Sequence, residues 1–145
     1  MNDFAKLGLA INVSSAERMP LIARGEDEAR KDENGVAAYI EYLSEDSEPG
    51  RKFARDTQRD TIRKIRRGGA KVIDETDDLE SHIAKLCVLG TGWHLVSAEG
   101  AFVDIPFSPA NLRTFLEMPG HFWAVRDSAI FVGTAANFTK ASSAS

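Results

Sequence analysis

The chain has 145 residues, of which 43% are hydrophobic and 28% charged, as expected for one folded domain. Its net charge of −4 argues against a protein that binds nucleic acid through bulk positive charge. No run of 18 apolar residues or signal-peptide pattern is present, and the single Cys87 excludes an internal disulfide, which together indicate a protein of a reducing compartment without a membrane span.

The N-terminal part is expected to be rich in strands. Residues 1–18 have the pattern of an N-terminal arm that forms a short strand or docks on another surface. The apolar run 19–23 and the aromatic and branched run 36–44 are typical of strands, and a polar stretch between them ends in the turn pair Asn34-Gly35. We expect a hairpin or meander whose polar segment is an exposed loop or tip.

The rest of the chain is expected to be mainly helical. The stretch 51–67 predicts a helix that ends at Gly68-Gly69. A second helix should begin with Asp77 as its N-cap and end near residue 90, followed by two short extended segments at 93–96 and 101–107. The apolar stripe of the first helix is thin, which indicates one narrow buried face: Phe53, Ala54, Ile62 and Ile65.

Two more helices are expected near the C-terminus. Ser108-Pro109 predicts a helix start, because serine caps the first turn and proline suits its first position. A last helix should run from about residue 121 to about residue 133 or beyond. The predicted fold class is therefore α+β, with a small N-terminal β-hairpin or meander and a helical C-terminal two-thirds. We expect a single domain over 1–140 and a disordered tail over 141–145.

The residues that commonly carry catalysis or bind metals are scattered. His82, His94 and His121 lie in three different predicted elements, and Cys87 lies on an apolar helix face. The glycine clusters follow helices, whereas a phosphate-binding loop precedes one. The acidic cluster over 74–80 lacks the pattern of a calcium loop and suits a helix N-terminus. The sequence predicts no catalytic residue, no cofactor and no metal site.

The basic helix allows three interpretations. Arg55, Arg59, Arg63 and Arg66 are spaced by four, four and three residues and share one face. The segment 51–67 contains eight basic and two acidic residues, while its neighbours 17–48 and 72–127 are acidic. The face could be solvated with intrachain ion pairs, dock an acidic protein partner, or track a phosphate backbone. Asp56 and Asp60 interrupt the charge, and interleaved aromatic residues are missing, which argues against nucleic acid.

The last predicted helix is apolar over more than half of its circumference. Phe122, Trp123, Ile130 and Phe131 are candidate protein-binding residues, because aromatic side chains are common anchors of interfaces. The alternatives are that all four are core residues, or that the helix mediates self-association into a homo-oligomer.

Several short motifs follow one another in the C-terminal half. They are Gly92-Trp93-His94-Leu95-Val96, Glu99-Gly100, Pro106-Phe107-Ser108-Pro109-Ala110-Asn111-Leu112 and Ala136-Asn137-Phe138. This order resembles the tail assembly chaperones of long-tailed, siphovirus-like bacteriophages, and the segment 38–47 running into 51–53 is similar to the same group. The resemblance spans roughly residues 35–140.

The resemblance implies a non-catalytic factor of the host cytoplasm. Such a factor binds the tape-measure protein, keeps it soluble and helps to recruit tail-tube subunits. The alternative within the same phage is a structural virion protein, such as a tail-completion or tube-associated subunit. A small nucleic-acid-binding regulator that uses the basic helix is a third hypothesis.

Overall fold

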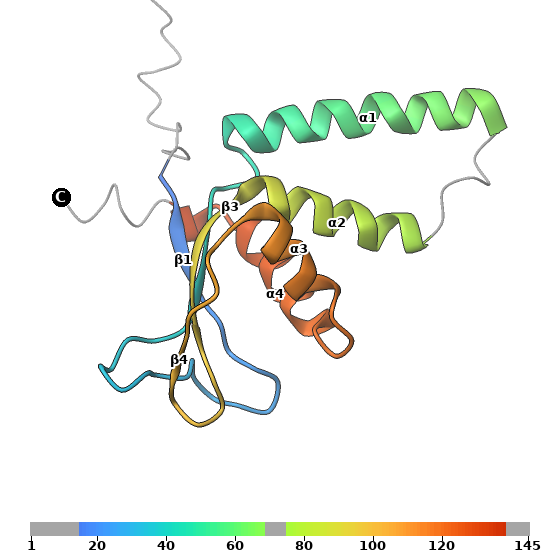
Figure 1. Cartoon of the computed structure of the whole chain (residues 1–145). Helices are drawn as coiled ribbons and strands as arrows, with labels where there is room; N and C mark the ends of the chain where they lie inside the picture. Colours follow the sequence, from blue (N-terminus) through green and yellow to red (C-terminus); the bar gives the residue numbers. More distant parts are fainter. Residues whose placement is uncertain (1–14, 69–74, 139–145) are drawn as a thin grey trace, which may run out of the picture.

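The fold is built on a four-stranded antiparallel sheet with the order β1-β2-β3-β4 (Figure 1). The computed structural model describes residues 15–68 and 75–138. The strands are β1 (Glu17–Pro20), β2 (Tyr39–Tyr42), β3 (Gly90–Val96) and β4 (Phe102–Val103). The predicted α+β class is confirmed, and the expected N-terminal hairpin is the β1–β2 pair.

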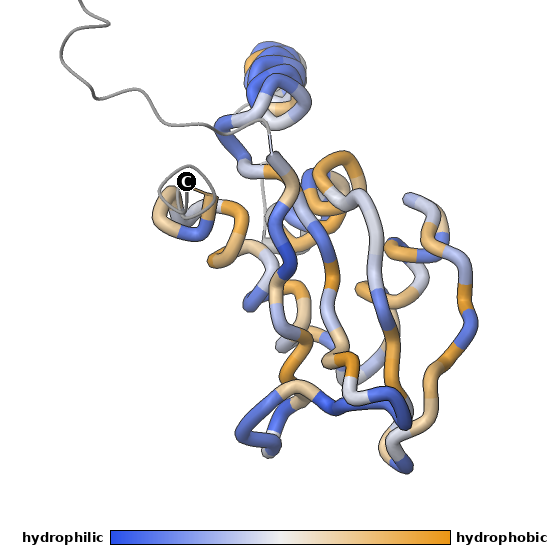
Figure 2. The backbone as a smooth tube through the Cα atoms, turned by 90° about the vertical axis from the view of Figure 1, so that its left-hand side faces the viewer, coloured by the Kyte–Doolittle hydropathy of each residue, from blue (hydrophilic) through white to orange (hydrophobic). Residues whose placement is uncertain are grey.

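The helices lie on one side of this sheet. They are α1 (Glu48–Gly68), α2 (Glu75–Leu89), α3 (Pro109–Glu117) and α4 (Phe122–Val132). Helices α2, α3 and α4 pack on one another, while α1 lies along α2 on its side away from α3 and α4 (Figure 1). The tube of α1 is largely hydrophilic where Figure 2 shows it end on, which fits its limited contact with the core.

The two faces of the sheet differ in kind, because side chains alternate along each strand. The helix-facing side buries Met19, Ile40, Tyr42 and Leu95 in the core. The other side carries a row of stacked groups, one from each strand. The Arg18 guanidinium lies 4.2 Å from the centre of the Tyr39 ring. The His94 ring stacks between the rings of Tyr39 and Phe102, with distances of 5.9 and 4.9 Å between ring centres. This row links all four strands.

The segment that leaves β2 connects the sheet to two helices. The amide of Leu43 donates to the carbonyl of Leu89 at the end of α2 (2.9 Å), and the amide of Glu45 donates to Val132 at the end of α4 (3.0 Å). These bonds occupy carbonyls that a helix C-terminus leaves without intrahelical partners. The ends of α2 and α4 are thereby held at the same corner of the sheet.

Several predicted boundaries were wrong. Helix α1 begins at Glu48, with Pro49 in its first turn, and not at residue 51. Helix α2 begins at Glu75, so Asp77 lies inside the helix and is not its N-cap. Of the expected strand over 101–107, only Phe102–Val103 pairs with β3. The cap at Ser108 is confirmed, since its hydroxyl accepts from the amide of Asn111 at 3.0 Å.

The apolar stripe of α1 is thinner than predicted. Phe53 is half-buried, but Ala54 is exposed and Ile62 has 43% of its surface exposed. The side chain of Ile65, residues 1–14 of the expected N-terminal arm and the tail over 141–145 all lie outside the described part of the structure. The two last residues of the expected arm, Glu17 and Arg18, belong to β1.

Gly50 provides a test of how α1 is positioned. A Cβ atom on this residue would overlap the backbone carbonyl of Glu45. The Glu45 backbone is held in place because its amide donates to the Val132 carbonyl at the end of α4. We expect Gly50→Ala to lower the free energy of unfolding by about 2 kcal/mol or more, measured by urea titration. Gly92→Ala is the matched control, because its Cβ would meet nothing nearer than Glu41 Oε1 at 3.7 Å. Equal stability of the two variants would contradict this account.

The buried hydrogen bond between Tyr42 and Ser128 provides a second test. The Tyr42 hydroxyl donates to Ser128 Oγ at 2.9 Å, and both residues are fully buried. Burial raises the pKa of Tyr42, so its hydroxyl remains a donor at neutral pH. Tyr42→Phe leaves the serine unpaired and should cost about 1–2 kcal/mol of unfolding free energy. In the double variant with Ser128→Ala, the two losses should be less than additive by denaturant titration.

Candidate protein-binding surface

The large apolar side chains of α4 divide between two environments. Phe122 and Ile130 have 60% and 62% of their surfaces exposed. Trp123 and Phe131 are half-buried and pack against the core. Trp123 and Phe131 therefore contribute to the core, and their role in binding stays a prediction. The alternative that all four are core residues is wrong for Phe122 and Ile130.

The buried face of α4 explains this division. It consists of Ala124, Val125, Ser128 and Val132, which repeat every three or four residues and face the sheet and the other helices. Phe122, Arg126 and Ile130 also repeat at intervals of four residues, but on the opposite side of the helix. We call these last three residues the outer stripe of α4. All three are exposed.

A groove runs beside the outer stripe between α2 and α4. Its volume is about 420 Å³, and the outer stripe forms one of its walls. The residues that line it are Leu79, His82, Phe122, Val125, Arg126, Ala129 and Ile130. Most of these side chains are apolar, and Arg126 and His82 supply the basic groups.

Two further hollows extend the groove. A hollow of about 370 Å³ below the end of α3 shares Leu79, Phe122 and Val125 with it. Another of about 250 Å³ lies between α4 and β1 and shares Ile130 with it. Phe122 and Ile130 thus stand at the junctions of three adjoining hollows. Exposed apolar surface that lines adjoining hollows is typical of a binding site for another protein.

The basic face of α1 is a separate surface. Arg55 lies 3.6 Å from Glu48 and Arg63 lies 3.7 Å from Asp60, and all four side chains are more than half exposed. Such pairs contribute at most about 1 kcal/mol each. Arg59 is exposed and has no ion pair recorded within the described residues. Helix α1, which carries these arginines, lies on the side of α2 away from α3 and α4 (Figure 1).

His94 is held by contacts within the fold. His94 Nε2 lies 2.8 Å from Asp32 Oδ2, a pair 62 residues apart that sequence reasoning missed. Hydrogen bonding by the Val36 amide, by His94 and by the Asn34 amide lowers the pKa of Asp32, which is buried and orders the loop around Gly35. The His94 ring stacks between the rings of Tyr39 and Phe102, and its Nε2 is engaged by Asp32.

His121 and Cys87 also contact or pack against other parts of the fold. His121 Nδ1 lies 2.7 Å from the Phe115 carbonyl. Cys87 is half-buried, and burial raises the pKa of its thiol, which disfavours a nucleophilic thiolate. Over residues 15–68 and 75–138, no group of three potential ligands could hold a metal ion, and no helix is long and apolar enough to cross a membrane.

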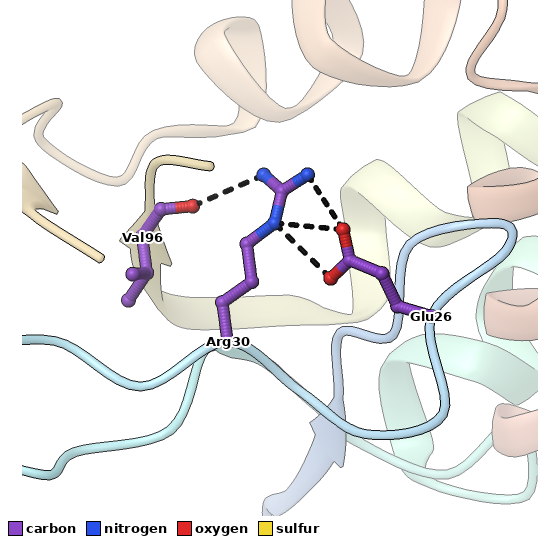
Figure 3. Close-up of polar contacts among 3 residues, drawn as sticks. All are labelled: Glu26, Arg30 and Val96. Carbon is purple, nitrogen blue, oxygen red and sulfur yellow. Dashed lines mark hydrogen bonds and ion pairs between the residues drawn. The ribbon is translucent and has the colours of Figure 1, made fainter. Parts of the chain in front are cut away.

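A separate cavity, of about 520 Å³, lies under the loop that joins β1 to β2. Arg30 lines it, and Figure 3 shows its guanidinium between the Glu26 carboxylate and the Val96 carbonyl. Nη2 donates to Glu26 at 2.8 Å and Nη1 to Val96 at 3.4 Å. Because the carboxylate already neutralises this arginine, it anchors the loop and is a weak candidate for binding an anion.

Comparison with protein-family models, with curated proteins and with solved structures gave no match for this chain.

The division of α4 into two faces predicts two classes of substitution. Trp123→Ala and Phe131→Ala remove side chains that pack against the core and should each lower the unfolding free energy by about 2 kcal/mol or more. Phe122→Ala and Ile130→Ala should change it by less than about 0.5 kcal/mol, because both side chains are mostly exposed. Chemical denaturation of the four variants measures this. Large losses at positions 122 and 130 would show that they belong to the core.

Proposed function

We propose that this chain is a non-catalytic protein-binding factor that holds its partner on the outer stripe of α4. The observation that carries the proposal is the exposure of Phe122 and Ile130 beside the groove between α2 and α4. Large apolar side chains in a hollowed surface gain free energy when a partner covers them, and interfaces are commonly anchored by such residues. The rigid core behind α4 keeps this surface preformed, which lowers the entropic cost of binding.

The narrower proposal is a tail assembly chaperone of a long-tailed bacteriophage. In this role the chain acts in the host cytoplasm, binds the tape-measure protein and helps to recruit tail-tube subunits. The resemblance supports it, and its motifs have a clear structural use here. Trp93 Nε1 donates to the carbonyl of Ile105 at 2.7 Å, and Asn111 Nδ2 donates to that of Pro106 at 2.9 Å. These bonds hold the connection from β4 to α3, which in turn packs on α4.

Co-expression with a tape-measure protein tests both levels of the proposal. We expect the large protein to become soluble and to elute with this chain. The double variant Phe122→Ala/Ile130→Ala should abolish co-elution while it remains folded, as judged by circular dichroism. Val88→Ala is the matched control, because Val88 is 46% exposed on α2 and is not among the residues that line the groove.

Two other results would redirect the proposal. Binding that survives the double variant would show that α4 is not the interface. Failure to co-elute, together with recovery of the chain from purified virions, would favour the structural virion protein over the chaperone.

A further inference from the structure

The outer stripe of α4 has a positive charge at its centre. Arg126 lies four residues after Phe122 and four before Ile130, and it lines the same groove as both. It is exposed, and no ion pair or side-chain hydrogen bond is recorded for it within the described residues.

Among the side chains that the structure describes, the carboxylates closest to the groove have other positions or partners. Glu80 and Glu117 line the neighbouring hollow and both pair with Arg113, at 2.7 and 3.4 Å. Asp127 lines the hollow beyond Ile130, between α4 and β1. The charge in the middle of the groove is therefore available to a partner.

A partner that covers both exposed apolar residues must also cover Arg126. The three residues form one stripe, so a surface in contact with positions 122 and 130 passes over position 126. Removing a guanidinium from water without a counter-charge is unfavourable by several kcal/mol, whereas an opposed carboxylate offsets most of that cost. The partner surface is thus expected to be apolar at its ends and acidic at its centre.

The groove favours a helical partner over an extended one. It is bounded by side chains of α2 and α4, so it presents no free strand edge with which an extended peptide could pair. The stripe from 122 to 130 spans about 12 Å, a little over two helical turns, which matches apolar anchors at i and i+7 or i+8 of a docked helix.

The charge also argues against a second copy of the chain as the occupant. A two-fold contact between two α4 helices centred on the stripe would place one Arg126 against the other. Like charges in such a desolvated contact are destabilising.

We propose that the groove between α2 and α4 binds an amphipathic helix of the partner protein that sets an acidic residue against Arg126. This deepens the proposed function and rests on its assignment of α4 as the interface. The pairing of this acidic residue with Arg126 lets the groove discriminate among apolar helices, whereas an uncharged groove would bind them with similar affinity.

Two synthetic helical peptides of about 18 residues, or five turns, can test the charge match. They share leucine anchors at i and i+7 and differ only at i+4, which is glutamate in one and lysine in the other. Fluorescence anisotropy should show the glutamate peptide binding the wild-type chain about tenfold more tightly. Arg126→Glu should invert this preference. Arg59→Glu, an exposed change of equal charge on α1, should leave it unaltered.

Equal affinity for the two peptides, no binding of either, or no inversion in Arg126→Glu would overturn the inference. Loss of the preference in Arg59→Glu would move the interface to α1 and also overturn it. Sedimentation of the chain as a dimer that Phe122→Ala/Ile130→Ala disperses would identify a second copy as the occupant instead. Inversion with the peptides but no co-elution of a tape-measure protein would uphold the acidic-helix site and remove only the chaperone assignment.

Discussion

The arrangement of the molecule depends on the buried contact between Tyr42 and Ser128. It joins the central part of the sheet to the middle of α4, and the next residues along the chain bind the ends of α2 and α4 through Leu43 and Glu45. One short segment therefore determines how far apart these two helices lie. The position of the groove between them therefore depends on this corner as well as on the residues that line it.

Local patterns were sufficient to predict most of the helices. Ser108-Pro109 marks the start of α3 because a serine hydroxyl can satisfy the first free amides, and the structure shows that bond. The bounds of α4 were predicted to within about one residue, since Pro119-Gly120 and Gly133 flank it. The start of α2 was predicted less well, because several acidic residues in succession are all suited to an N-terminal turn.

Features that join distant segments could not be predicted in the same way. The contact of His94 with Asp32 and the pairing of β2 with β3 depend on how the helical hairpin α1–α2 returns the chain to the sheet. The division of α4 into core and surface residues has the same origin. An apolar helix has no marked face in its sequence, so the sheet behind it decides which side is covered.

The small residues of α4 show why its outer stripe remained apolar. Ala124 and Ser128 are completely buried, and their small side chains allow the helix backbone to approach the sheet closely. If the large apolar side chains of α4 served only the core, they would be expected at the positions that face the sheet. Phe122 and Ile130 instead lie on the far side, with a charge between them. A side that needed only to be soluble could be polar at these positions, and this contrast is the basis of the proposed contact with a partner.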